Sequence, residues 1–264
     1  MYIYRTDFTK SFPDNQLTTL SSQHVNTAYT TSCREHTEII IYRKEEWFKV
    51  FIHETFHNFG LDFSEMNLSH INTKMKKIFN INTEYNIYES YCETWARIIN
   101  TMFYTYYQLL PKFRGDTKDF VAIFYKNINY EISFSLYQAI KILRFMGLHY
   151  DIINDKTDEN ITACNHLYKE NTSVFSYYIV TAILLHNYMD FVHWCNANNN
   201  KLLKFKITPD NIDSYIQLIK KSNNKRLLSN INTIYKFFKS SNNINSNNTL
   251  QMSLLDLDNL SIVL

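Results

Sequence analysis

Residues 36–60 read HTEIIIYRKEEWFKVFIHETFHNFG and carry the clearest structural signal in this chain. Their first part, His36–Tyr42, is short and rich in β-branched side chains, which predicts a strand. From Trp47 to Phe59 apolar residues recur at helical spacing, which predicts a helix whose buried stripe comprises Phe48, Phe51, Ile52, Thr55 and Phe59. Gly60 follows at the position where a helix C-cap uses left-handed backbone, so we expect the helix to end there.

The composition is typical of a mainly helical protein. The chain has 264 residues, only three glycines and three prolines, and a formal net charge of +2. So few glycines exclude a Gly-rich phosphate loop and argue against a turn-rich β-sandwich. The near-balanced charge argues against a dedicated nucleic-acid binder. We therefore expect an α+β fold that is mainly α-helical, with a short β-sheet.

Further elements follow from apolar spacing along the chain. We expect a strand at Tyr2–Tyr4 and short helical pieces within Asp62–Asn86. Longer helices are predicted at Tyr88–Leu110 (closed by Pro111), Phe120–Leu148, Val174–Trp194 and, as one or two helices, Asn211–Phe238. Residues 240–248 form a low-complexity Ser/Asn linker that leads to an apolar tail at 250–264.

The cysteines and the apolar runs indicate the compartment. Cys33, Cys92, Cys164 and Cys195 are scattered without a C-x-x-C pair, and no charged-then-apolar leader opens the chain. The longest apolar run, Val174–Leu185, is shorter than the roughly 20 residues of a membrane span. We expect reduced thiols, no membrane association and a cytoplasmic location. Heavy use of Asn, Ile, Lys, Tyr and Phe is typical of an AT-rich genome such as that of a large DNA virus, which would place the protein in the host cytoplasm or the virion.

The predicted helix contains His53-Glu54-Thr55-Phe56-His57, an H-E-x-x-H motif. Residues four apart share a helix face, so both imidazoles can reach one ion, and imidazole suits Zn²⁺. Glu54 lies beside the first histidine, where a carboxylate can act as general base on a zinc-bound water. The alternative is an ordinary amphipathic helix with two histidines. Because the flanking residues are strongly apolar, these polar groups would be buried and would need partners. We therefore predict one catalytic zinc ion bound by His53 and His57.

A third ligand is expected from the long helix, where Glu89 and Glu93 lie four residues apart on one face. Together with H-E-x-x-H, this E-x-x-x-E pattern resembles the zincin metallopeptidases, specifically the thermolysin-like gluzincins, over residues 36–100. The resemblance implies that Glu89 is the third zinc ligand and that Glu93 hydrogen-bonds the ring of His53 from behind. It also implies that Cys92 takes the place of a small residue that lets the two helices approach closely.

Other alignments of these residues stay open. Glu93 could be the zinc ligand, but Arg97 would then occupy the position of the second acid. Alternatively the two acids are a solvated pair and Arg97 pairs with Glu93. The metzincin pattern H-E-x-x-H-x-x-G-x-x-H/D matches through Gly60 but has Phe63 at its last position, and phenylalanine cannot bind zinc. Asp62, one residue earlier, is interpreted as a loop residue or a cap.

Peptide hydrolysis by zincins commonly uses a tyrosine or histidine that donates to the oxyanion. The sequence offers several candidates and does not choose between them, and for each of them the pattern favours a role as a hydrogen-bonded core residue. They are Tyr177, Tyr178, His186, His149 and Tyr150.

The resemblance implies a zinc-dependent metallopeptidase with a polypeptide substrate, in which Glu54 activates the water. It implies a zincin-like catalytic core at residues 1–115, a helical subdomain at 116–239 that completes the cleft, and a linker with an apolar tail at 240–264. We expect no nucleic-acid or membrane partner, and the sequence leaves the oligomeric state open. One alternative is a catalytically weak zincin-fold protein that binds polypeptide or serves a structural role. The other is a chance motif in an all-helical interaction protein.

Overall fold

A computed structural model describes residues 1–31, 36–67, 69–110, 117–240 and 248–260. Within these ranges the chain is mainly helical with one small sheet, which confirms the mainly helical α+β class. The strands are β1 (Tyr2–Thr6), β2 (Ala28–Thr30) and β3 (Ile39–Arg43). The α-helices are α1 (Ser22–Val25), α2 (Trp47–Asn58), α3 (Ser69–Met75), α4 (Ile87–Leu109), α5 (Thr117–Phe145), α6 (Asp158–Leu167), α7 (Thr181–His186), α8 (Tyr188–Asn198), α9 (Pro209–Ser222) and α10 (Lys225–Ser240). Short 3₁₀ turns lie at η2 (Asp151–Ile153) and η5 (Leu257–Asn259), and η3 (Phe175–Val180) is a π-helix.

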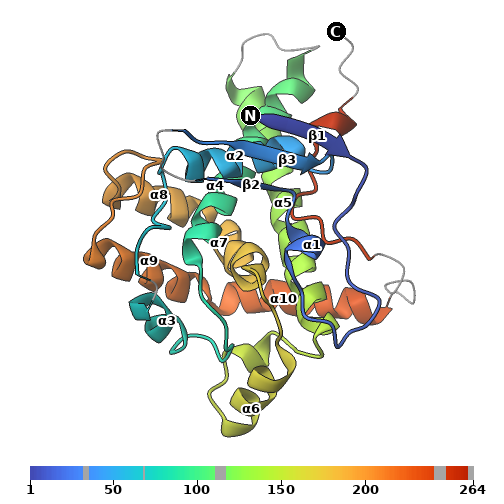
Figure 1. The fold of residues 1–264 in the computed structure, drawn as a ribbon, viewed down its shortest axis with the longest axis vertical. Coiled ribbons are helices and arrows are strands. Elements are labelled where there is room, and N and C mark those ends of the chain that lie inside the picture. The colour runs from blue at the N-terminus through green and yellow to red at the C-terminus, as the bar shows by residue number, and fades with distance from the viewer. Residues whose placement is uncertain (32–35, 68, 111–116, 241–247, 261–264) are drawn as a thin grey trace.

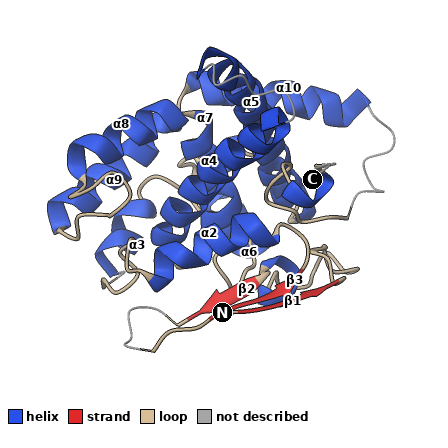
Figure 2. Cartoon of the chain, turned by 90° about the horizontal axis from the view of Figure 1, so that it is seen from above, coloured by secondary structure: helices blue, strands red, loops and turns tan. Residues whose placement is uncertain are grey.

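The sheet has the strand order β1-β3-β2, with β1 parallel and β2 antiparallel to the central strand β3. Figure 2 shows it at one side of the molecule, with the helices gathered on one of its faces. Ile39 and Ile41 of β3 point to that face and pack with Val50 of α2. The predicted strands at β1 and β3 are confirmed. Strand β2 was not predicted, because three residues are too few to show a period.

Helix α2 follows β3 and ends as the sequence predicted. Gly60 has φ 57°, its N–H donates to the carbonyl of His57, and the N–H of Leu61 donates to the carbonyl of Phe56. This is a Schellman turn, which needs the left-handed backbone that glycine adopts at least cost. The predicted stripe is wrong at Phe59, which is 68% exposed. Of its other members only Ile52 is buried, while Phe48, Phe51 and Thr55 are half-buried. The buried face of α2 carries charged and imidazole side chains among its apolar ones: Lys49, Ile52, His53, Glu54, Phe56 and His57.

Helix α4 packs against α2 on one side and against α5 on another, and it lies in the middle of the helical layer (Figure 1). One hydrophobic cluster extends from Phe12 to Met252 and includes residues from all three predicted segments of the chain. The boundary predicted at residues 115 and 116 and the helix end predicted at Pro111 lie outside the described residues. The division into core, subdomain and tail therefore stays a prediction.

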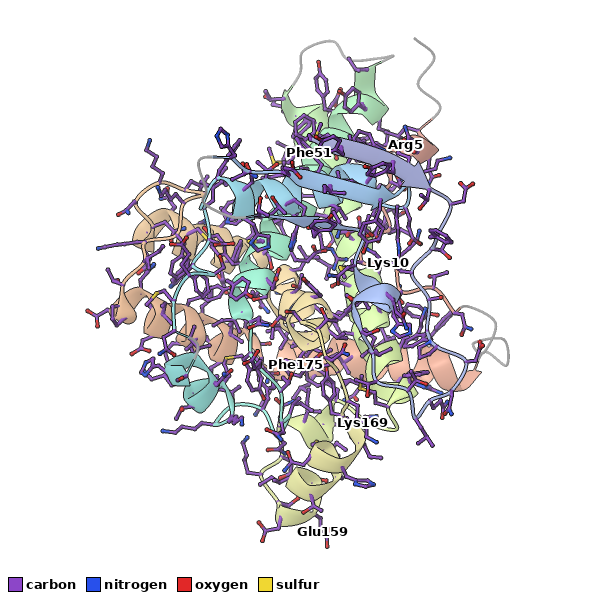
Figure 3. The ribbon with its side chains drawn as sticks, viewed as in Figure 1. Arg5, Lys10, Phe51, Glu159, Lys169 and Phe175 are labelled. Atoms are coloured by element: carbon purple, nitrogen blue, oxygen red, sulfur yellow. The ribbon has the colours of Figure 1, made fainter. Side chains whose placement is uncertain are left out.

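The long helix predicted at Val174–Trp194 is wrong, because three helical pieces occupy this stretch. The π-helical segment η3 comes first, and the hydroxyl of Thr181 donates to the carbonyl of Ser176 at its end. Helices α7 and α8 follow, with a break at Asn187. Phe175, at the start of η3, lies in the middle of the molecule, whereas Glu159 on the unpredicted helix α6 lies at its tip (Figure 3).

Cys92, Cys164 and Cys195 are buried and free, while Cys33 lies outside the described residues. The same holds for residues 241–247 of the predicted linker and 261–264 of the predicted tail. Among the described helices, none combines the length and apolar character that crossing a membrane requires.

Candidate metal centre and active site

Helix α2 brings His53 and His57 to one face, and α4 brings Glu89 opposite them. Nε2 of His53 lies 3.1 Å from Nε2 of His57, and both nitrogens lie 3.1 Å from Oε2 of Glu89. Neighbouring ligands of a tetrahedral zinc ion with bonds of about 2.0–2.1 Å are about 3.3 Å apart. The three atoms therefore form a triangle of the size that zinc requires, and these residues fit the ion.

Both histidine rings are fixed from behind by buried carboxylates. Nδ1 of His53 lies 3.1 Å from Oε2 of Glu93, and Nδ1 of His57 hydrogen-bonds Oδ2 of Asp62. Burial alone would raise the pKa of Glu93, but the Lys49 ammonium, the hydrogen bond to His53 and the charges of His53 and Arg97 together lower that pKa. Burial also opposes ionisation of Asp62, but the hydrogen bond from His57 lowers its pKa. Both carboxylates are thus ionised acceptors, so the partners assign the ring proton to Nδ1 in each histidine.

This assignment leaves the Nε2 lone pairs of His53 and His57 directed at each other and at the carboxylate of Glu89. Three acceptor atoms only 3.1 Å apart repel one another unless a positive charge lies between them. His53 is only 6% and His57 only 9% exposed, so little water screens the repulsion between these acceptor atoms. The site therefore requires a cation, either a metal ion or additional protons.

The position of Glu93 distinguishes Glu89 from Glu93 as the carboxylate that faces the two Nε2 atoms. Its carboxylate lies at Nδ1 of His53 and accepts a hydrogen bond from Lys49 Nζ at 2.8 Å, on the side of the ring away from the Nε2 atoms. Glu89, rather than Glu93, faces those Nε2 atoms. Arg97 pairs with Glu131 at 2.7 Å and not with Glu93, and Glu93 is buried rather than solvated.

The loop after α2 contributes a residue whose role was missed from the sequence. Asp62 accepts hydrogen bonds from the N–H of Ser64 at 3.0 Å and from its hydroxyl at 2.9 Å, as expected of a loop residue that caps a turn. Its other oxygen serves His57. The Schellman turn at Gly60 reverses the chain and brings Asp62 back to the helix. The spacing of only five residues between His57 and Asp62 was the sequence signal that could have indicated this contact. Phe63 packs in the core, with its ring 4.2 Å from that of Phe205.

Cys92 lies in the space between α2 and α4. Its Sγ is 3.4 Å from Oδ2 of Asp62 and 3.8 Å from Nδ1 of His57. Burial raises the pKa of this thiol well above its usual range, so it is a neutral donor to Asp62. Its small side chain contacts both helices where the ligands meet.

Glu54 lines a cleft of about 250 Å³ that opens beside the ligand triangle. In the part of the chain that the structure describes, its carboxylate has no hydrogen-bond partner, which leaves it available to a bound water. Burial raises the pKa of Glu54, while positive charge on His53 and His57 opposes that rise. A carboxylate with a raised pKa is a stronger base than an exposed one. The remaining lining residues are Asn26, Ala28, Tyr29, Thr30, Ser64, Tyr88, Glu89, Tyr177 and the two histidines.

Of the candidate oxyanion donors, only Tyr177 lines this cleft. Its ring lies 5.9 Å from the ring of His53, and its hydroxyl makes no hydrogen bond to the described residues. The other candidates have roles elsewhere: Tyr178 donates to the carbonyl of Leu250, Tyr150 donates to Asn223, His149 stacks on Tyr235, and His186 contacts Asn230. Tyr88, which the sequence did not single out, also lines the cleft, with its ring 6.0 Å from that of His57.

Comparison with models of known protein families, with curated proteins and with solved structures finds no match to this chain.

Proposed function

We propose that this protein is a zinc-dependent metallopeptidase built on a zincin-like core. The observation that carries the proposal is the convergence of two Nε2 lone pairs and one carboxylate oxygen, each 3.1 Å from the others, on a point that needs a cation. The ligand types, two imidazoles and one carboxylate beside an open cleft, are those of catalytic rather than structural zinc sites. His53, His57 and Glu89 would hold the ion, with Glu93 and Asp62 orienting the two rings.

When bound, zinc would lower the pKa of a coordinated water and polarise the substrate carbonyl. Glu54 takes the proton from the attacking water and later delivers it to the leaving amine. The hydroxyl of Tyr177 donates a hydrogen bond to the oxygen that gains charge as water attacks. Burial of the surrounding groups keeps these interactions strong, because little water competes with them.

The substrate proposed here is an extended stretch of polypeptide. Strand β2 is an edge strand of the sheet, and its residues Ala28–Thr30 line the same cleft as Glu54. An extended chain can pair with the backbone of an edge strand, so its carbonyls would pass beside the metal centre. The buried, free cysteines are consistent with the cytoplasmic, reducing location expected from the sequence.

The test compares the wild-type protein with Glu54→Gln and Glu89→Gln. Zinc content is measured by elemental analysis, and cleavage is measured on unfolded casein and on a peptide library. Glu159→Gln, at the distant tip of α6, is the matched control (Figure 3). We expect Glu54→Gln to retain zinc and lose about 10²- to 10⁴-fold in turnover. Glu89→Gln should lose zinc, and Glu159→Gln should behave as wild type.

Other outcomes contradict the proposal in distinct ways. Zinc bound at full occupancy by wild type without turnover would favour a polypeptide-binding protein instead. Wild-type protein that binds no zinc would contradict both the metallopeptidase and the zincin-fold polypeptide-binding protein.

A further inference from the structure

The C-terminal segment 249–255, here called the strap, runs through the interior although its sequence only indicated a short apolar tail. Leu250, Met252, Ser253 and Leu255 are all buried. The N–H of Leu250 donates to the carbonyl of Lys10, and the following turn η5 lies beside β1, where Arg5 pairs with Asp258 (Figure 1). The strap therefore links the end of the chain to its first residues and to α2.

Buried side chains hold the strap by its backbone. The hydroxyl of Tyr178 donates to the carbonyl of Leu250, and Asn100 donates to that of Leu255 at 2.7 Å. Two carboxylates accept its amides: Glu131 accepts from Leu254 at 3.0 Å, and Glu46 accepts from both Met252 and Ser253. Main-chain hydrogen bonds to buried side chains therefore fix the path of the strap, together with the buried side chains of Leu250 and Met252.

Glu46 is also the first member of a buried chain of charges that ends at a proposed zinc ligand. Lys10 Nζ lies 2.6 Å from Glu46, and Lys49 Nζ lies 3.9 Å from Glu46 but only 2.8 Å from Glu93. Glu93 in turn contacts Nδ1 of His53. None of these charged groups is more than 3% exposed, so each depends on its neighbours for compensation. Lys10 lies inside the molecule, below the sheet in the view of Figure 3.

The strap affects which carboxylate in this chain of charges the ammonium of Lys49 contacts. Glu46 and Glu93 compete for the ammonium of Lys49. Met252 and Ser253 supply two N–H donors to Glu46, and Lys10 supplies an ammonium at 2.6 Å. Glu46 is therefore satisfied without Lys49, which lies close to Glu93. Glu46 also has φ 57°, a left-handed conformation that is unfavourable for a residue with a side chain. Its strained backbone places the carboxylate under the strap, and its own N–H donates to Asp256 at 3.3 Å.

We propose that docking of the strap on Glu46 positions His53 for zinc through Lys49 and Glu93, so that the zinc affinity depends on the C-terminal segment. The inference rests on the proposed function, since it concerns the same ion. Glu46 and Lys49 are positioning residues, because they act on the ligand through Glu93. The strap is thus an intramolecular part of the metal centre, and Sδ of Met252 lies 3.7 Å from Nζ of Lys49.

The experiment measures zinc affinity by chelator competition in full-length Lys49→Met and Glu46→Gln. Glu131→Gln is the matched control, since it removes a buried carboxylate that accepts a strap amide but pairs with Arg97 rather than with Lys49. Tyr178→Phe is a second control that removes one strap contact only. The ¹⁵N shifts of the His53 ring in metal-free protein report its protonation state, and circular dichroism checks folding.

We expect Lys49→Met to weaken zinc binding by about 10- to 100-fold and Glu46→Gln by about tenfold, as for outer partners of metal ligands. Both should shift the Nδ1 resonance of His53, which a general loss of stability would not do. Glu131→Gln and Tyr178→Phe should keep the wild-type zinc affinity and the wild-type His53 resonance, and if one control fails to fold the other remains.

Equal zinc affinity in Glu46→Gln and wild type would overturn the inference while leaving the proposed function intact. Equal losses in Glu46→Gln and in the folded controls would overturn the route through Glu46 and Lys49, because zinc affinity would then follow any loosening of the strap rather than the contact with Glu46. Wild-type protein that binds zinc and fails to cleave peptides would contradict only the proposed function.

Discussion

Asp62 accepts a hydrogen bond from Nδ1 of His57, which lies only five residues earlier in the chain. The pair closes around the turn at Gly60, and it matches the contact between Glu93 and Nδ1 of His53 on the other side of the site. Each proposed ligand from α2 thus has its own carboxylate. One carboxylate comes from the loop that follows the helix, and the other comes from the neighbouring helix α4.

The first prediction concerns this contact. Asp62→Asn replaces an ionised acceptor by a neutral amide, so Nδ1 of His57 loses a charge-assisted hydrogen bond and the ring loses its preferred tautomer. We expect zinc affinity to fall about 10- to 100-fold, measured by chelator competition. Ser64→Ala, which affects only the other oxygen of Asp62, is the control and should bind zinc as wild type does.

A second prediction separates two adjacent tyrosines. Tyr177→Phe removes the hydroxyl in the cleft, and we expect kcat to fall about 10²- to 10³-fold with zinc content unchanged. Tyr178→Phe removes the donor to the buried carbonyl of Leu250, and we expect a loss of about 1–3 kcal/mol in unfolding free energy with kcat kept. Equal kcat values for both variants would rule out Tyr177 as the oxyanion donor.

The third prediction concerns the pH dependence of stability at Glu170. This carboxylate accepts from the hydroxyl of Tyr168 and the N–H of Phe175, both at 2.7 Å, at the start of the π-helical segment. Burial raises its pKa to about 7, although the hydrogen bonds from Thr83 and Tyr168 oppose the rise. Because the folded-state pKa exceeds the unfolded one, the stabilisation is complete below pH 4.5 and is lost as the pH rises through 7.

Glu170→Gln cannot ionise and should escape this loss. We expect the unfolding free energy of the variant, relative to wild type, to rise by about 3 kcal/mol between pH 4.5 and pH 8. Denaturant titrations at several pH values measure this difference. A difference that does not change with pH would contradict the raised pKa.

The fourth prediction tests the turn that ends α2. Gly60 has φ 57°, so Gly60→Ala should cost about 1–2 kcal/mol in unfolding free energy. Gly60→Asn is the matched variant, because asparagine tolerates left-handed backbone better than alanine, and it should cost less. Urea unfolding of the two variants provides the measurement, and an alanine variant as stable as the asparagine variant would show that the backbone has relaxed to another conformation.

The sequence predicted those parts of the site in which the residues concerned lie on the same helix. The helical period places His53 and His57 on one face of α2, and it places Glu89 and Glu93 on one face of α4, whatever packs around them. The end of α2 at Gly60 was equally local, since glycine adopts left-handed backbone at little cost. Errors arose where tertiary packing overrides local preference: Phe59 is exposed, and the helix predicted at Val174–Trp194 is divided by a π-helical segment and a break.

Only the tertiary structure decided which buried charges meet. Lys49 donates to Glu93, which is 44 residues away in the chain. Met252 and Ser253 satisfy Glu46 across more than 200 residues. Neither contact leaves a period or a motif in the sequence, because a buried ion pair needs only complementary charges brought together by packing. The candidate ligands could therefore be predicted from the residues of α2 and α4, whereas the buried groups that support them became visible only in the folded structure.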